Sequence, residues 1–125
     1  MLGAGLDSFA IRNRAIASQV DIYEIDRPDT LAWKETKLVE NGYAIPPKLH
    51  FVPVDFETSS WWIALLKKGF DYTQPSFVFC TGVTLYLTKE AIRDMLQKIT
   101  CWQQDQPSLL PFTCLLNNWK GKTKI

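Results

Sequence analysis

The chain has 125 residues, 46% of them hydrophobic and 13% aromatic, which is enough for one domain with a real core. Lys and Arg number 14 and Asp and Glu 13, and this balance of +1 argues against a nucleic-acid or anionic-membrane partner. The sequence contains no run of 18 apolar residues and no signal-peptide order at its start, so we expect a cytoplasmic protein.

The first informative element is a glycine loop, Gly3-Ala-Gly5, preceded only by Met1 and Leu2. Loops of this kind normally follow a buried β-strand and lie close to a nucleotide-type cofactor. We therefore expect the chain to be a piece of a larger protein. A helix beginning near Asp7 or Ser8 would turn its positive end towards a carboxylate or phosphate of the ligand.

Alternating strands and helices follow the loop. The β-branched and aromatic segment 20–25 predicts a strand, and residues 30–40 have helical spacing up to Asn41-Gly42. Segment 49–54 predicts a second strand, placed towards an edge by Pro53. A helix over 59–68, capped by Ser59 or Ser60, comes next.

The most apolar run, 76–83, predicts a strand covered on both faces. Thr88 then caps a helix that carries apolar residues up to Ile99 on one face. The pattern weakens after Cys101, and a last strand over 109–116 is interrupted by Pro111. Strands separated by helices predict an α/β fold with a mostly parallel sheet.

Ligands of such sheets bind at the carboxyl ends of the strands, and polar residues gather there. Glu24 and Asp26 end one strand and can accept hydrogen bonds from ribose hydroxyls, or be a solvated strand end. Asp55 and Phe56 end the next strand, where a carboxylate suits an exocyclic amine or caps a helix. After the third strand, Tyr86 would line the same pocket or pack in the core.

The cysteines Cys80, Cys101 and Cys114 are widely spaced, and His50 is the single histidine. This spacing favours reduced thiols over a zinc site or a Cys/His nucleophile, so we predict no metal.

Four segments in order, 2–12, 23–28, 52–56 and 82–87, resemble the leucine carboxyl methyltransferase-like family of class I S-adenosylmethionine-dependent methyltransferases. The resemblance covers residues 1–100 and implies a partial S-adenosylmethionine-binding domain with a Rossmann-like, doubly wound sheet. Residues 101–125 form a divergent C-terminal segment outside it.

The resemblance also implies the cofactor contacts. Gly3 and Gly5 approach the methionine part of S-adenosylmethionine, and Asp7 and Arg12 support that loop. Either Glu24 or Asp26 binds the ribose hydroxyls, and Glu24 is favoured.

Asp55 and Phe56 would hold the adenine. Thr81 stands where many members have Glu, next to the methionine amino group. The implied activity is O-methyl transfer to a carboxylate or hydroxyl of a small molecule or a protein terminus, and the sequence leaves the acceptor open. Two alternatives remain: a nicotinamide-dinucleotide-binding domain, although Ser8 replaces the third glycine of that motif, and a non-catalytic remnant or interaction module.

In the class I sheet the first strand is central and lies just upstream of the glycine loop. We therefore expect a partial sheet that lacks this strand, with an untethered Gly3–Gly5 loop and exposed apolar surface around Val20, Phe77 and Phe79. A complementing chain or an oligomer would cover that surface.

Overall fold

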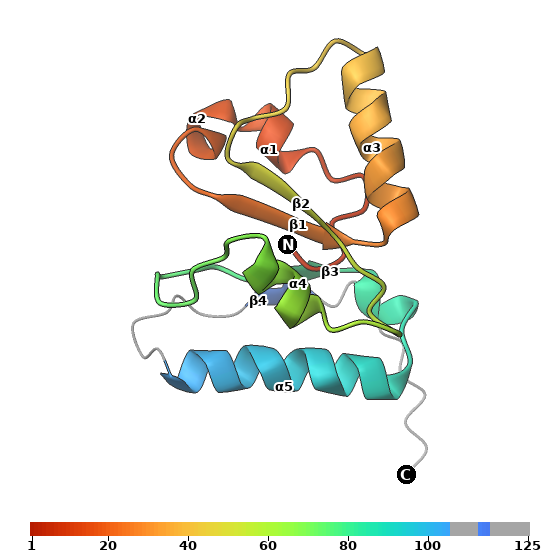
Figure 1. Ribbon diagram of the computed structural model, residues 1–125, viewed down its shortest axis with the longest axis vertical. Coiled ribbons are helices and arrows are strands. Elements are labelled where there is room, and N and C mark those ends of the chain that lie inside the picture. The colour runs from red at the N-terminus through yellow and green to blue at the C-terminus, as the bar shows by residue number, and fades with distance from the viewer. Residues whose placement is uncertain (106–112, 116–125) are drawn as a thin grey trace.

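The computed structural model describes residues 1–105 and 113–115 and is shown in Figure 1. Its strands are β1 (Ile22–Asp26), β2 (Leu49–Pro53), β3 (Phe79–Thr81) and β4 (Thr113–Leu115). Its α-helices are α1 (Phe9–Arg12), α2 (Arg14–Ala17), α3 (Pro28–Glu40), α4 (Trp61–Lys67) and α5 (Lys89–Asp105). A 3₁₀ turn, η1 (Val83–Leu85), follows β3.

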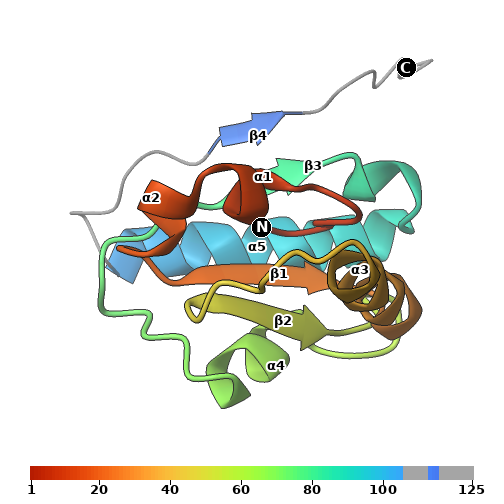
Figure 2. The ribbon, with the colours of Figure 1, turned by 90° about the horizontal axis from the view of Figure 1, so that it is seen from above.

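The strands are parallel, as the sequence predicted. β1 pairs with β2 in a register that places Ile22 opposite Leu49, and β3 pairs with β4. Leu2 forms a parallel bridge to Ile25 of β1 and another to Cys80 of β3. Figure 2 shows the resulting arrangement of β4, β3, β1 and β2 across the molecule. The expected α/β class with a parallel sheet is therefore confirmed.

The expectation of an untethered glycine loop is wrong. Leu2 donates its backbone N–H to the Phe79 carbonyl at 2.7 Å, and Gly3 donates to the Ile25 carbonyl at 2.8 Å. Ile25 in turn donates to the Met1 carbonyl at 2.9 Å. Residues 1–3 thus lie between β1 and β3, and their backbone bonds hold the start of the loop at the middle of the sheet.

Helices cover both faces of the sheet, because apolar residues of β1 and β2 alternate between two cores. In Figure 1, α1, α2 and α3 lie on one face and α4 and α5 on the other. The larger core joins the strands to α4 and α5 and contains Leu2, Ile25, Val52, Val54, Trp61, Leu65, Cys80, Met95 and Ile99. The smaller core lies beside α1 and α2 and contains Ala10, Ile11, Ala17, Ile22 and Leu49.

The third predicted strand is shorter than its apolar run. The strand comprises Phe79–Thr81, which pairs with Thr113–Leu115 and bridges to Leu2 through Cys80. Phe77 is 49% exposed and Val20 48% exposed, so the expected apolar surface around them is present, whereas Phe79 is half-buried.

The helix after Thr88 is longer than predicted. It continues through Asp105, and Trp102 is only 7% exposed, with its indole N–H donating to the Tyr72 carbonyl at 3.0 Å. The strand predicted over 109–116 appears as Thr113–Leu115, and its other residues lie outside the described part. None of the helices in the part of the chain that the structure describes is long and apolar enough to cross a membrane.

Candidate functional site

A cavity of about 470 Å³ lies at the carboxyl ends of β1, β2 and β3. This is where parallel α/β sheets bind ligands, and the volume falls in the usual range for small-molecule sites. The lining residues come from the glycine loop, from the ends of β1 and β2, and from the segment after β3. They are Gly3, Gly5, Asp26, Arg27, Thr30, Asp55, Phe56, Glu57, Gly82, Val83, Leu85, Tyr86 and Leu87.

The glycine loop needs both of its glycines, for different reasons. Gly3 has a φ of +69°, and a Cβ at this position would lie 2.4 Å from the Cβ of Val83. Gly5 has a φ of +49°, and its N–H donates to Asp26 Oδ2 at 2.6 Å. Side chains rarely adopt such φ values. The glycine at position 3 therefore lets the loop pack on η1, and the glycine at position 5 lets the loop backbone line the cavity.

Asp26 ends β1 and joins the loop to the cavity. Its side chain is half-buried, Oδ2 accepts from the Gly5 N–H, and Oδ1 accepts from the Arg27 N–H at 2.7 Å. A carboxylate offers about four acceptor sites, so Asp26 retains capacity for a donor in the cavity.

Glu24, the acid favoured for ribose from the sequence, does not line the cavity. It is 1% exposed, and its Oε2 accepts from the ammonium of Lys34 on α3, which is 4% exposed. Burial raises the pKa of Glu24, and the Lys34 hydrogen bond and charge oppose that rise. Glu24 and Asp26 share one side of β1, but only the residue at the strand end reaches the cavity.

Asp55 and Phe56 both line the cavity just beyond β2, and both are half-buried. Asp55 Oδ1 accepts from the Glu57 N–H at 2.9 Å, which closes a local turn. Within the described residues, no hydrogen bond uses Asp55 Oδ2, so this oxygen remains available to a ligand.

Asp7 and Arg12 stabilise the segment after the loop and lie outside the cavity lining. Asp7 Oδ1 accepts from the Phe9 N–H at 2.6 Å, and the exposed Arg12 donates from Nε to Ser8 Oγ at 2.9 Å. Because α1 has four residues and its first N–H is already bonded to Asp7, the expected anion-facing helix end is absent from this place.

The segment after β3 forms the other wall of the cavity. Thr81 ends β3, and its side chain lies outside what the structure describes. Gly82 has a φ of +73° and starts η1. Leu85 is 54% exposed and Tyr86 is 85% exposed, so Tyr86 stands at the rim of the cavity rather than in the core.

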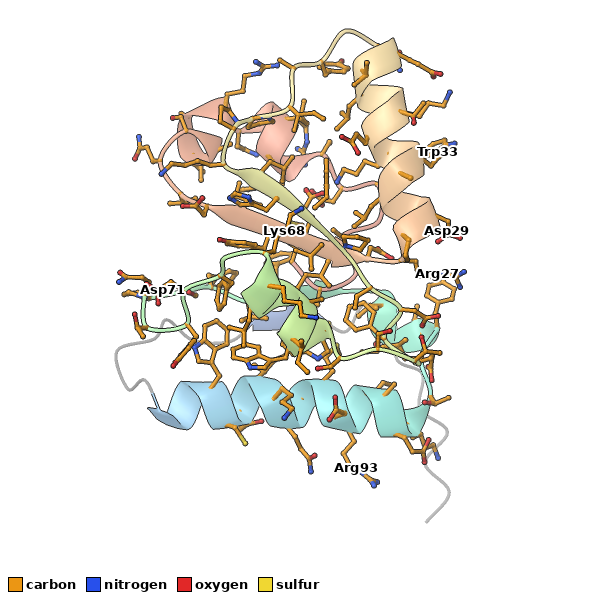
Figure 3. All side chains as sticks on the ribbon, in the orientation of Figure 1. Arg27, Asp29, Trp33, Lys68, Asp71 and Arg93 are labelled. Atoms are coloured by element: carbon orange, nitrogen blue, oxygen red, sulfur yellow. The ribbon has the colours of Figure 1, made fainter. Side chains whose placement is uncertain are left out.

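The sequence missed several lining residues. Arg27 stands at the start of α3, where Figure 3 shows it with Asp29. The Arg27 guanidinium bonds both carboxylate oxygens of Asp29, at 3.2 and 3.3 Å, and this pairing raises the pKa of Arg27. The sequence could have indicated Arg27 as a lining residue through its position directly after Asp26.

Glu57 was also missed. Its two carboxylate oxygens accept from the N–H and the hydroxyl of Thr88, at 2.7 and 2.9 Å, before α5 begins. The Thr88 hydroxyl accepts in turn from Ala91, as the predicted cap. Glu57 therefore ties the loop after β2 to α5 and closes that side of the cavity.

The cavity is acidic. Asp26, Asp55 and Glu57 line it, and Arg27, the one basic residue among the described lining residues, is paired with Asp29. No cluster of three or more His, Cys, Asp or Glu side chains that would hold a metal occurs within residues 1–105 and 113–115. The cavity therefore suits a ligand that presents hydrogen-bond donors or positive charge.

Residues 1–100 match the model of the family described as leucine carboxyl methyltransferase. A Bacillus subtilis (strain 168) protein named "Putative S-adenosyl-L-methionine-dependent methyltransferase YktD" is 35% identical over 99 residues, which are 79% of this chain and 32% of the relative. A Mycobacterium tuberculosis (strain ATCC 25177 / H37Ra) protein named "Putative S-adenosyl-L-methionine-dependent methyltransferase" is 34% identical over 126 aligned residues, 99% of this chain and 39% of the relative.

The fold, the cavity at the strand ends and the family match agree, and the chain belongs to the leucine carboxyl methyltransferase family. It spans about a third of the length of these curated relatives.

Proposed function

We propose that this chain forms the S-adenosylmethionine-binding part of a methyltransferase. The observation that carries the proposal is the pair of carboxylates, Asp26 and Asp55, at the ends of two adjacent parallel strands and facing one cavity with Gly5 and Gly82. Ribose hydroxyls and an adenine amine are hydrogen-bond donors, and a sulfonium is cationic. All three groups fit acceptor oxygens and glycine backbone better than they fit basic side chains.

Asp26 is assigned to the ribose hydroxyls in place of Glu24, because Glu24 is buried in its pair with Lys34. Asp55 accepts from the adenine amine through Oδ2, and Phe56 lies beside the ring.

Gly3 and Gly5 bring the loop close to the methionine part of the cofactor, and Asp7 and Arg12 hold the segment that follows. Thr81 remains the proposed neighbour of the methionine amino group, on its position at the end of β3.

The bound cofactor would supply a methyl group on a sulfonium that is already a good leaving group. The residues of the chain bind and orient that group and exclude water from it, and such alignment accounts for much of catalysis. Alignment of this kind requires no histidine pair, and the described residues that line the cavity include none.

The methyl acceptor is proposed to be a carboxylate or hydroxyl of a small molecule or a protein terminus, in line with the family description. Exposed Phe77 and Val20 support association with a further protein surface, either a complementing chain or a second copy.

A nicotinamide dinucleotide fits less well. Its pyrophosphate would meet the carboxylates of Asp26, Asp55 and Glu57 without a helix N-terminus to bind it, since Asp7 occupies the first N–H of α1. The acidic lining therefore favours S-adenosylmethionine over this alternative, and the remnant hypothesis predicts binding of neither.

Calorimetric titration of the chain with S-adenosylhomocysteine and with NAD tests the proposal. We expect binding of S-adenosylhomocysteine alone, weakened by Asp26→Ala by about 1–3 kcal/mol, the scale of a lost hydrogen bond with a charged group. Glu35→Ala, on the exposed side of α3, is the control and should leave the affinity unchanged. Binding of NAD with equal affinity, or of neither molecule, would contradict the proposal.

A further inference from the structure

Lys34 is buried in a helix whose exposed side carries apolar residues. Its side chain is 4% exposed, whereas Trp33 and Val39 on the same helix are 51% and 63% exposed. A lysine side chain is seldom buried away from water unless its ammonium is paired. The role of Lys34 therefore follows from the groups that its ammonium contacts.

The Lys34 ammonium joins two separate parts of the chain. It donates to Glu24 Oε2 on β1 and to the backbone carbonyl of Asp7, which ends the loop 3–7 that contains both glycines. The loop is closed by a bond from the Asp7 N–H to the Ala4 carbonyl at 2.9 Å. The ammonium therefore fixes the outgoing end of the loop against β1 and α3.

The incoming end of the loop is fixed independently. Gly3 donates to the Ile25 carbonyl, and Gly5 donates to Asp26 Oδ2. Within the described residues, the Lys34 contact is the only hydrogen bond that joins Asp7 to α3 and β1, because the Asp7 side chain bonds forward to the Phe9 N–H.

We propose that Lys34 is a positioning residue for the cofactor: its contact with the Asp7 carbonyl holds the loop 3–7 in the conformation that presents Gly5 to the cavity. The consequence for affinity rests on the function proposed above. A buried ion pair adds little stability over apolar residues of similar size, so we assign the Lys34–Glu24 pair mainly to holding the loop and only to a lesser degree to stabilising the fold.

Replacing both residues of the pair with apolar residues separates a role in positioning the loop from a role in stabilising the fold. The variant Lys34→Met/Glu24→Leu removes both charges and leaves neither partner buried alone, so we expect it to keep its cooperative melting transition. The matched control is Lys37→Met/Glu40→Leu. It makes the same substitutions at an exposed ion pair of α3, in which Lys37 Nζ lies 2.7 Å from Glu40 Oε2.

The first measurement uses no ligand. Amide hydrogen exchange of Gly5 and Asp7 should become about tenfold faster or more in Lys34→Met/Glu24→Leu, because exchange reports local opening. The amide of Val54, which donates to the Asp26 carbonyl in the sheet, is the internal reference. Unchanged exchange at Gly5 and Asp7 would overturn the proposal.

The second measurement is the affinity for S-adenosylhomocysteine. We expect a loss of about tenfold or more in Lys34→Met/Glu24→Leu and a change below about twofold in the control. Wild-type affinity in the stable double variant would show that the pair is only structural. Failure of the wild-type chain to bind would contradict the proposed function, while the exchange measurement still decides the role of Lys34.

If the double variant does not melt cooperatively, the single variant Glu24→Gln tests the proposal instead. This variant keeps the ammonium and its contact with the Asp7 carbonyl and supplies a neutral acceptor beside it. Exchange at Gly5 and Asp7 should stay within about threefold of wild type. Exchange about tenfold faster would overturn the proposal, because the loop would then depend on the charge of Glu24.

Discussion

The two walls of the cavity are built differently. The wall formed by the ends of β1 and β2 carries Asp26 at the end of β1 and Asp55 just beyond β2, and these two strands pair over five residues each. The wall formed by residues 82–87 follows a three-residue strand and presents the apolar, exposed Leu85 and Tyr86. The first wall places hydrogen-bonding atoms on a rigid scaffold, and the second supplies apolar area.

The walls meet at the glycine loop. Gly3 packs against Val83 of the apolar wall, while Gly5 bonds to Asp26 of the acidic wall. The loop thus contacts both walls, and changes on the two walls should have different consequences.

The largest loss of stability is expected at Glu24, which lies on β1 two residues before Asp26 of the acidic wall, the wall formed by the ends of β1 and β2. Glu24→Ala leaves the Lys34 ammonium buried without its carboxylate, and breaking a buried pair in this way costs about 3–5 kcal/mol of unfolding free energy. Urea denaturation measures the loss. Glu40→Ala, which removes the partner of the exposed Lys37, should change stability by less than about 1 kcal/mol. Equal effects of the two substitutions would contradict the difference between the buried and exposed pairs.

The next largest loss of stability is expected at Gly3, where the glycine loop packs against Val83 of the apolar wall. Gly3→Ala would place its Cβ 2.4 Å from the Cβ of Val83, and we expect a cost of about 1–3 kcal/mol from overpacking in addition to the strain of a positive φ. Gly42→Ala is the control, since Gly42 has a similar φ of +75° and no atom within 4 Å of an added Cβ. Denaturation midpoints compare the two, and the combination Gly3→Ala/Val83→Gly, which removes the clashing Cβ of Val83, should recover part of the loss.

A smaller and more local effect is expected at Asp55. Asp55→Ala should weaken S-adenosylhomocysteine by about 1–3 kcal/mol, because it removes an acceptor for the adenine amine. Asp55→Asn keeps an oxygen for the Glu57 N–H and so separates the turn from the ligand contact. If calorimetry gives wild-type affinity for both variants, Asp55 does not contact the adenine.

The smallest effect is expected on the apolar wall. Tyr86 is 85% exposed, so Tyr86→Ala should change stability by no more than about 0.5 kcal/mol. Any change in affinity for S-adenosylhomocysteine should be smaller than that of Asp55→Ala, since Tyr86 stands at the rim. A larger effect on affinity than at Asp55 would mean that the apolar wall dominates binding.

The sequence by itself determined the parallel α/β class, the order of the elements and the position of the cavity. Alternation of short apolar runs with helical spacing predicted β1, β2, α3 and α4 within a few residues, because local patterns reflect which side of each element is buried. The strand-end rule placed Glu24 and Asp26, together with Asp55 and Phe56, at one edge, and all of these except Glu24 line the cavity.

Only the tertiary structure distinguishes the positions of Glu24 and Asp26, because Asp26 lines the cavity and Glu24 does not. Both acids have the same chemistry and lie two residues apart on one side of a strand, and the sequence pattern did not fix the residue at which that strand ends. The difference comes from Lys34, ten residues further along the chain, whose position on α3 pairs it with Glu24 and not with Asp26. In the same way, the tethering of the glycine loop depended on long-range backbone bonds of residues 1–3 to β1 and β3, which no spacing in the sequence reveals.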